Sequence, residues 1–323
     1  PPYHPPKPVQ DFKGENLNPA IAHSHQLIQL RYAARELSGF PKMQARQVLA
    51  GGHRSQFRGR GMDFDQVRLY QAGDDVRSID WRVTARTQTP HTKVFIEERE
   101  RPILIITDLR SPMFFGSQRL KSVVACEIAA SLAWAGLGIN DRVGGLIFGA
   151  QQQLEIKPKR SHHNALQLIH GLQKYSEALL KAQQDQYDLA TVLEESRRVV
   201  LPGSTVFIIS DFYDLNKQCE PHLFALAKHC NVNFCQVYDN LERQLPEPAL
   251  YAVSNGEKQA MLDTGDQTLC DNFANQFSQR EEYLRKLSEQ LHAGLLAFGT
   301  VDPVMRTLAM AYGKRRKNPK RHN

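Results

Sequence analysis

The sequence predicts an α/β fold in which a doubly wound, mostly parallel sheet carries helices on both faces. Residues 103–107 and 205–210 are continuous apolar runs, which are typical of strands buried on both faces. Around them, helical periodicities of ten or more residues alternate with shorter strand-like runs. This alternation favours parallel strands joined by helical crossovers, in a sheet that begins near Arg101.

The individual elements are placed by their periodicity and by the residues that end them. Helices are expected at 25–37, 42–49, 119–137, 164–180, 189–200, 221–229, 267–292 and 303–312. Strands are expected at 92–98, 103–107, 142–148, 153–156, 205–210, 233–238 and 295–299, with a hairpin of 249–253 and 258–263. The expected domain organisation is a disordered start at 1–20, N-terminal helices with a signature segment at 21–100, the α/β domain at 101–313 and a basic tail at 314–323.

The formal net charge of +7 comes largely from the end of the chain. Residues 314–323 hold six Lys and Arg residues and no acid, so the rest of the chain carries about +1. A second acid-free stretch, 42–62, contains five basic residues. Such segments bind phosphates or acidic surfaces, and in the tail they also serve as solvated charge that aids solubility. Both interpretations stay open.

The cysteine pattern and the absence of long apolar runs indicate where in the cell the protein is expected. Five cysteines occur and none forms a C-x-x-C pair, which favours free thiols in a reducing compartment. We find no apolar run long enough to span a membrane and no apolar segment of a signal peptide near Pro1. The expectation is therefore a cytoplasmic protein without a membrane span.

Two carboxylates directly follow the two apolar strands. Asp108 comes after 103–107, and Asp211 comes after 205–210. In an open α/β sheet, ligands bind beyond the carboxyl ends of the strands. A pair of acids there could hold a hard cation through oxygen ligands, serve phosphoryl transfer, or cap helix N-termini.

An ordered series of motifs resembles a known family. The motifs are G-R-G-M-D-F at 59–64, R-L-Y-Q-A-G-D-D-V-R-S-I-D-W at 68–81, A-R at 85–86, K-V-F-I-E-E-R at 93–99 and D-R-V-G-G-L-I-F at 141–148. In this order they resemble the family called domain of unknown function 58. The resemblance implies a von Willebrand factor A-like (Rossmann-like) fold and a role as adaptor or assembly factor beside a MoxR-type AAA+ ATPase.

The resemblance also implies a metal-ion-dependent adhesion site that has degenerated. Related domains bind a divalent metal through D-x-S-x-S, a Thr on a second loop and an Asp on a third. Asp108 and Asp211 match the two acids, whereas Arg110, Pro112 and Tyr187 stand at the hydroxyl positions. We expect no metal, with Asp108 and Asp211 as the only remaining ligand candidates. Arg110 could instead lie between them as a salt bridge, and this rim could contact a partner.

The segment 68–81 alternates positive and negative side chains around Tyr70 and Trp81. One interpretation is a loop held by Arg–carboxylate pairs, with Trp81 packed against the domain. The other is a recognition surface, because Trp, Tyr and Arg dominate binding hot spots. The partner-binding residues that we expect are Arg68, Asp74, Arg77, Asp80 and Trp81 in this segment, and Asp108, Arg110, Ser111 and Asp211 at the sheet edge.

The favoured hypothesis is a non-catalytic adaptor that needs no cofactor, with the MoxR-type ATPase as partner by resemblance and an unnamed client. The chain contains neither G-x-x-x-x-G-K-[ST] nor G-x-S-x-G, so it is not a P-loop nucleotide binder or an α/β-hydrolase. One alternative is a nucleic-acid-binding protein that uses 42–62 and the tail. The other is a ligand-binding domain that depends on a divalent metal.

Overall fold

The chain forms two compact units. The computed structural model describes residues 17–37, 62–71, 74, 76–97, 102–181, 184–254 and 259–313. A large unit comprises Pro1–Lys42 and Arg101–Asn323, and a small unit comprises Met43–Glu100. The expected helix 42–49, the basic tail and nearly all of the basic stretch 42–62 lie outside the described residues.

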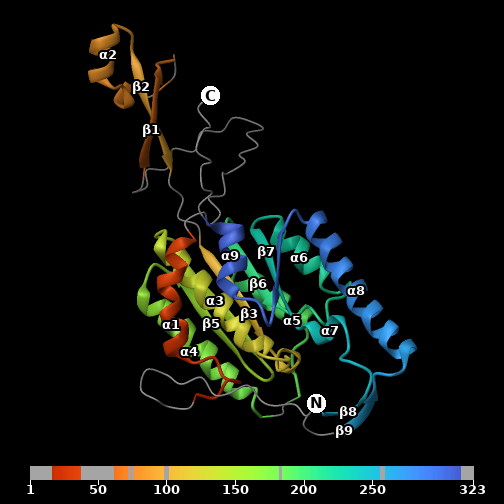
Figure 1. Cartoon of the computed structure of the whole chain (residues 1–323). Helices are drawn as coiled ribbons and strands as arrows, with labels where there is room; N and C mark the ends of the chain where they lie inside the picture. Colours follow the sequence, from red (N-terminus) through yellow and green to blue (C-terminus); the bar gives the residue numbers. More distant parts are fainter. Residues whose placement is uncertain are drawn as a thin grey trace, which may run out of the picture. The chain divides into compact units, whose positions relative to one another are not determined.

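The large unit is built on a six-stranded sheet with the strand order β10-β7-β6-β3-β4-β5 (Figure 1). The strands are β3 (Ile103–Leu109), β4 (Val143–Gly149), β5 (Gln153–Lys159), β6 (Thr205–Ser210), β7 (Asn231–Tyr238) and β10 (Gly294–Gly299). Neighbouring strands are parallel, except that the edge strand β5 runs antiparallel to β4. The chain winds outward from β3 in both directions, which confirms the doubly wound, mostly parallel α/β fold.

Helices cover both faces of this sheet. One face carries α3 (Lys121–Gly138), α4 (His162–Ala178) and α9 (Val304–Tyr312), and the other carries α5 (Leu189–Val199), α6 (Glu220–Ala227) and α8 (Gln267–Gln290). Alternate residues of β3 enter opposite cores: Ile103 and Ile105 belong to the first, Leu104 and Ile106 to the second. The continuous apolar run of β3 is therefore buried on both sides, as predicted.

The N-terminal helix α1 (Ser24–Ala33) belongs to the large unit. It packs on α3, where Leu27 is buried and its carbonyl accepts a hydrogen bond from Trp134 Nε1 at 3.1 Å. Ala22 N–H also donates to Ser176 Oγ on α4 at 3.0 Å. The segment expected at 21–100 is thus divided, because the helix at its start buries its apolar side against the α/β domain.

The small unit is an antiparallel pair with a short helix. It contains β1 (Met62–Leu69), α2 (Trp81–Thr87) and β2 (His91–Glu97), and β1 pairs with β2. β2 lies where the sequence predicts a strand, in a sheet of its own. The sequence does not predict β1, because its apolar–polar alternation slips by one residue at Asp65–Gln66, where the pairing with β2 is also irregular.

The remaining elements flank the sheet of the large unit. The predicted hairpin is present as β8 (Leu250–Ser254) and β9 (Gln259–Asp263). A one-turn helix, α7 (Asn240–Arg243), follows β7, and a 3₁₀ turn (Ser111–Met113) follows β3. Among the residues that the structure describes, no helix combines the length and the apolar character needed to cross a membrane.

The packing of α1 predicts that substitutions on its buried and exposed faces differ in their effect on the free energy of unfolding. Leu27→Ala is expected to lower the free energy of unfolding by about 2–5 kcal/mol, because it opens a cavity against α3. Tyr32→Ala, on the exposed side of the same helix, is the matched control and should change it little. Urea unfolding of both variants measures the difference. Equal, small effects would show that α1 is not part of the folded core.

Candidate functional site

The guanidinium of Arg110 lies at the carboxyl edge of the sheet between two acids. Arg110 Nε and Nη2 donate to the two oxygens of Asp108 at 2.9 and 2.7 Å. Nη1 and Nη2 donate to the two oxygens of Asp214 at 2.7 and 3.1 Å. Nη1 also donates to the carbonyl of Tyr187 at 3.1 Å. All five N–H groups of the guanidinium are therefore used within the protein.

This arrangement joins three loops. Asp108 is the second-last residue of β3, Asp214 lies beyond β6, and Tyr187 lies two residues before α5. Asp214 also accepts a hydrogen bond from Leu189 N–H at 2.8 Å, and the Ser210 hydroxyl donates to Asp108 Oδ2 at 2.7 Å. The Arg110 side chain is only 4% exposed, and its charge is balanced by the carboxylates of Asp108 and Asp214.

The expected pairing of Arg110 with Asp211 is wrong. Asp211 binds Lys121 instead, and Asp214 takes its place beside Arg110. The backbone between the two acids turns at Phe212, which adopts a left-handed conformation with φ of 54°. That conformation costs a non-glycine residue about 1–3 kcal/mol. Phe212 is buried edge-to-face against Phe234, and this packing offsets the cost.

Lys121 is a second buried cation at the same edge. It is the first residue of α3, its side chain is 2% exposed, and it donates to Asp211 Oδ2 at 2.7 Å and to Glu242 Oε1 at 2.6 Å. Glu242 also accepts from Asp239 N–H at 2.9 Å, in the capping box of α7. Lys121 thus links the start of α3 to the ends of β6 and β7.

Asp239, at the end of β7, completes the network. Its carboxylate accepts hydrogen bonds from Ser117 N–H at 2.8 Å and from Ser117 Oγ at 2.9 Å. The hydroxyl of Thr300, after β10, donates to the same oxygen. Hydrogen bonds and ion pairs therefore continue along the edge from β3 to β10.

These contacts decide the charge states of the edge. Burial alone would raise the pKa of Asp108, but Arg110 and the Ser210 hydroxyl outweigh it and hold that pKa below its ordinary value. Burial opposes the charged form of Lys121, yet Asp211 and Glu242 raise its pKa above the ordinary value. Asp108 thus stays ionised and Lys121 stays protonated at neutral pH.

The residues do not fit the divalent metal that the resemblance implies for related domains. The guanidinium of Arg110 takes the oxygens of Asp108 that a metal would need. A divalent ion 4 Å from a unit positive charge is repelled by about 8 kcal/mol at an effective dielectric of 20. Within the described ranges, no group of three or more His, Cys, Asp or Glu side chains is placed to hold a metal ion.

The other residues expected at this edge have structural partners. Ser111 donates from its N–H and its hydroxyl to Asp185 Oδ1, both at 3.0 Å. Tyr187 contributes its carbonyl, while its ring packs edge-on against Phe148. The sequence alone does not single out five further residues of this edge: Asp185, Asp214, Lys121, Glu242 and Asp239. A lysine at the start of a mostly apolar helix was the signal for Lys121.

Exposed aromatic side chains lie on the loops of the same edge. They are Phe114 and Phe115, after β3, and Tyr213, after β6, which is 59% exposed. Lys121 Nζ lies 5.7 Å from the ring centre of Phe115, and the guanidinium of Arg280 lies 4.9 Å from that of Tyr213. We call Phe114, Phe115 and Tyr213 the rim aromatics.

The signature segment lies in the small unit and holds some of the expected pairs. Arg68 donates to Asp74 at 2.7 Å, and Asp80 caps α2 by accepting from the N–H groups of Arg82 and Val83 at 3.1 and 3.2 Å. Arg77 is exposed. Trp81, however, is 67% exposed, so the small unit itself does not bury it.

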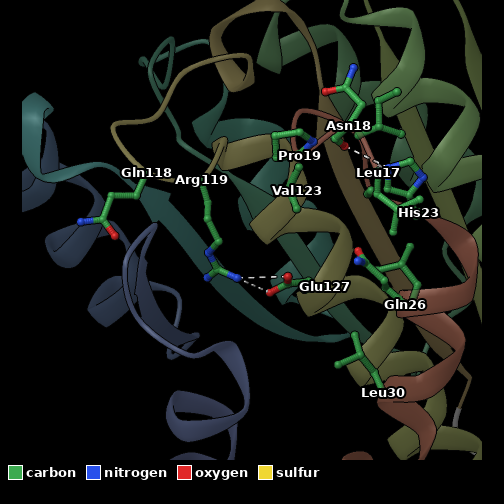
Figure 2. A pocket seen from close by; sticks show the side chains of 13 residues that line it. Leu17, Asn18, Pro19, His23, Gln26, Leu30, Gln118, Arg119, Val123 and Glu127 are labelled. Carbon is green, nitrogen blue, oxygen red and sulfur yellow. Dashed lines mark hydrogen bonds and ion pairs between the residues drawn. The ribbon is translucent and has the colours of Figure 1, made fainter. Parts of the chain in front are cut away.

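A cavity of about 350 Å³ lies between the N-terminal segment and α3 (Figure 2). Its polar side chains are largely paired within the protein: Arg119 Nη1 donates to both oxygens of Glu127 at 3.0 and 2.9 Å, and Arg119 Nε donates to Thr300 O at 2.9 Å. Burial raises the pKa of Glu127 although Arg119 opposes the shift. The cavity therefore lies at the junction between α1 and α3.

Comparison with known proteins defines the class of this chain. The family described as "Protein of unknown function DUF58" matches residues 66–283, so the chain belongs to that family. Uncharacterized proteins of Mycobacterium bovis and Mycobacterium tuberculosis are 28% identical over 271 residues, which cover 80% of this chain and 84% of theirs.

Solved structures with some similarity include two proteins. The conserved hypothetical protein BatB from Bacteroides thetaiotaomicron is 15% identical with a TM-score of 0.39, over 65% of this chain and 95% of BatB. The VWA domain of SpRpn10 is 11% identical with a TM-score of 0.34, over 65% of this chain and 93% of that domain.

Removal of the Arg110 guanidinium is expected to destabilise the large unit. Arg110→Ala should lower the free energy of unfolding by about 3–5 kcal/mol, because it leaves the buried Asp108 without its counter-charge. Asp108→Asn in the same chain should recover part of the loss, and a double-mutant cycle measures the coupling.

The controls separate this effect from surface charge and from metal binding. Arg285→Ala removes exposed pairs only and should leave the melting midpoint nearly unchanged. Wild-type melting curves should coincide in EDTA and in excess Mg²⁺, because the guanidinium holds the cation position. A clear stabilisation by Mg²⁺ would contradict the assignment.

Lys121 is expected to make stability depend on alkaline pH. Because its folded pKa is raised, its contribution is complete below its unfolded pKa of about 10.4 and is lost as pH rises toward the folded pKa. The difference in unfolding free energy between wild type and Lys121→Met should be constant near neutral pH and shrink by up to about 1.4 kcal/mol per pH unit above that value. Lys286→Met, an exposed control, should show no such change. A flat difference through that range would refute the prediction.

Proposed function

We propose that this protein is a non-catalytic interaction protein that binds partners at the carboxyl edge of its sheet, without a metal or a cofactor. The observation that carries the proposal is the Arg110 guanidinium, whose five N–H groups are all bonded within the protein. The resemblance implies that related domains hold a divalent metal at this edge. Here the cation is a side chain with no donor left to offer.

In this proposal, the exposed side chains of the edge make the contact with a partner. Asp108 and Arg110 are buried, and so is the Asp211 side chain, so these residues act by fixing the loops. The rim aromatics are carried by the loops that Arg110 and Lys121 hold. Aromatic side chains on ordered loops bind with a small loss of entropy and dominate the affinity of many interfaces.

The partner that we propose is a MoxR-type AAA+ ATPase, with which the protein acts in the assembly or maturation of other proteins. The support for this partner is the family resemblance, carried by the motifs between residues 59 and 148. The support for the edge as the contact surface is its exposed aromatic side chains beside a fixed charge network.

The proposal predicts that truncation of the rim aromatics weakens the complex. Phe115→Ala with Tyr213→Ala should lower the affinity for the MoxR-type ATPase of the same organism at least about tenfold, as expected for two hot-spot residues. Titration calorimetry with the purified ATPase measures this. Met310→Ala, which removes an even more exposed apolar side chain from α9, is the control and should bind as wild type.

Two results would contradict the proposal. If the ATPase does not bind the wild-type chain, the proposed partner is wrong. If it binds the double variant as tightly as wild type, the proposed surface is wrong.

A further inference from the structure

The small unit presents an aromatic and basic surface that the carboxyl edge does not explain. Trp81 opens α2 with 67% of its surface exposed, and Val76, just before the helix, is also exposed. Arg82 and Arg86 follow on α2, and both are exposed. We call Trp81, Arg82 and Arg86 the α2 surface.

Helical spacing places the two arginines side by side. Arg82 and Arg86 are four residues apart and therefore neighbours on the helix surface. Trp81 directly precedes Arg82, so its side chain lies about 100° around the helix axis from this pair. No carboxylate among the described residues forms a salt bridge with either arginine. The nearby acids are engaged elsewhere: Asp80 caps the helix and pairs with Lys93 at 3.7 Å, and Asp74 pairs with Arg68.

The helix that carries this surface is held in place by its own unit. Asp80 caps its start, and Thr84 Oγ1 accepts a hydrogen bond from His91 N–H at 3.0 Å, which ties α2 to the start of β2. Ile79, just before the helix, forms a β-bridge with Thr92. The exposure of Trp81 is thus a feature of an ordered element.

The two tryptophans of the chain differ sharply. Trp134 is 8% exposed, and its indole N–H donates to Leu27 O, so its burial explains its place in the core. Trp81 contributes no comparable packing to the small unit. An exposed Trp beside two arginines is the composition of an interface hot spot.

We infer that the α2 surface is a second docking site, and that its occupant is an acidic segment of a partner protein. Carboxylates of that segment pair with Arg82 and Arg86, and an apolar side chain packs on Trp81. Charge complementarity supports this occupant, since the guanidinium groups of Arg82 and Arg86 have no carboxylate partner within the described residues. A guanidinium also matches a carboxylate through two parallel hydrogen bonds. The inference does not depend on what binds the rim aromatics.

A peptide selection tests both the site and the chemistry of its occupant. A random peptide library is selected on the full chain, and the recovered peptides are measured on the chain with Arg82→Glu and Arg86→Glu. We expect enrichment of Asp and Glu next to apolar residues, and at least a tenfold loss of affinity on this variant. Trp81→Ala should weaken the same peptides, whereas Arg306→Glu with Met310→Ala on α9 should not.

Trp81 fluorescence gives a second measurement. Trp134→Phe leaves Trp81 as the only tryptophan, and its emission should shift as an acidic peptide binds. If this variant does not fold, calorimetry on the wild-type chain replaces it. Oligothymidylate is the nucleic-acid probe, because single strands also stack on Trp.

Several outcomes would overturn the inference. They are peptides that lack acidic residues, peptides that bind the Arg82→Glu, Arg86→Glu chain unchanged, and oligothymidylate that binds at Trp81 more tightly than any acidic peptide. Self-association of the chain that depends on Trp81 would also overturn it, since the occupant would be a second copy. Peptides that depend on Phe115 and Tyr213 alone would refute the α2 site and leave the rim proposal standing.

Discussion

The edge of this protein depends on one side chain, the guanidinium of Arg110. It joins the end of β3, the loop beyond β6 and the start of α5 through five hydrogen bonds. A bound ion exchanges with solvent, whereas Arg110 is covalently attached and charged at every physiological pH. The loops around it are therefore held in one arrangement by the chain itself.

Lys121 has a similar role beyond β6 and β7, where it is a buried cation between two carboxylates. Buried ion pairs gain little net stability, because each charge must first leave water. Their effect here is geometric: Arg110 and Lys121 each bring together carboxylates from separate loops, and Asp239 extends the network to Thr300. The rim aromatics project from loops that are already ordered, which lowers the entropic cost of binding.

The cationic side chains discussed above are buried in the large unit and exposed in the small unit. In the large unit, the cations of the edge are buried among acids and serve internal order. In the small unit, Arg82 and Arg86 are exposed beside Trp81, where they can act on another molecule. The two proposed binding surfaces therefore differ: one is shaped by internal ion pairs, and the other carries arginines without a carboxylate partner among the described residues.

The order of elements could be predicted from the sequence, because buried strands and amphipathic helices follow local periodicity. So could the place of Asp108 and Asp211, since an acid after an apolar strand lies at its carboxyl end. The residues that pair with these acids could not be predicted from the sequence. Asp214 replaces Asp211 beside Arg110 because the backbone turns at Phe212, and Lys121 reaches Asp211 from 90 residues away. The packing of α1 on α3 and the exposure of Trp81 are likewise long-range outcomes.

Local pattern determined which residues form the strands and helices, whereas tertiary packing decided which charges meet, because ion pairs depend on proximity in space and leave no period in the sequence.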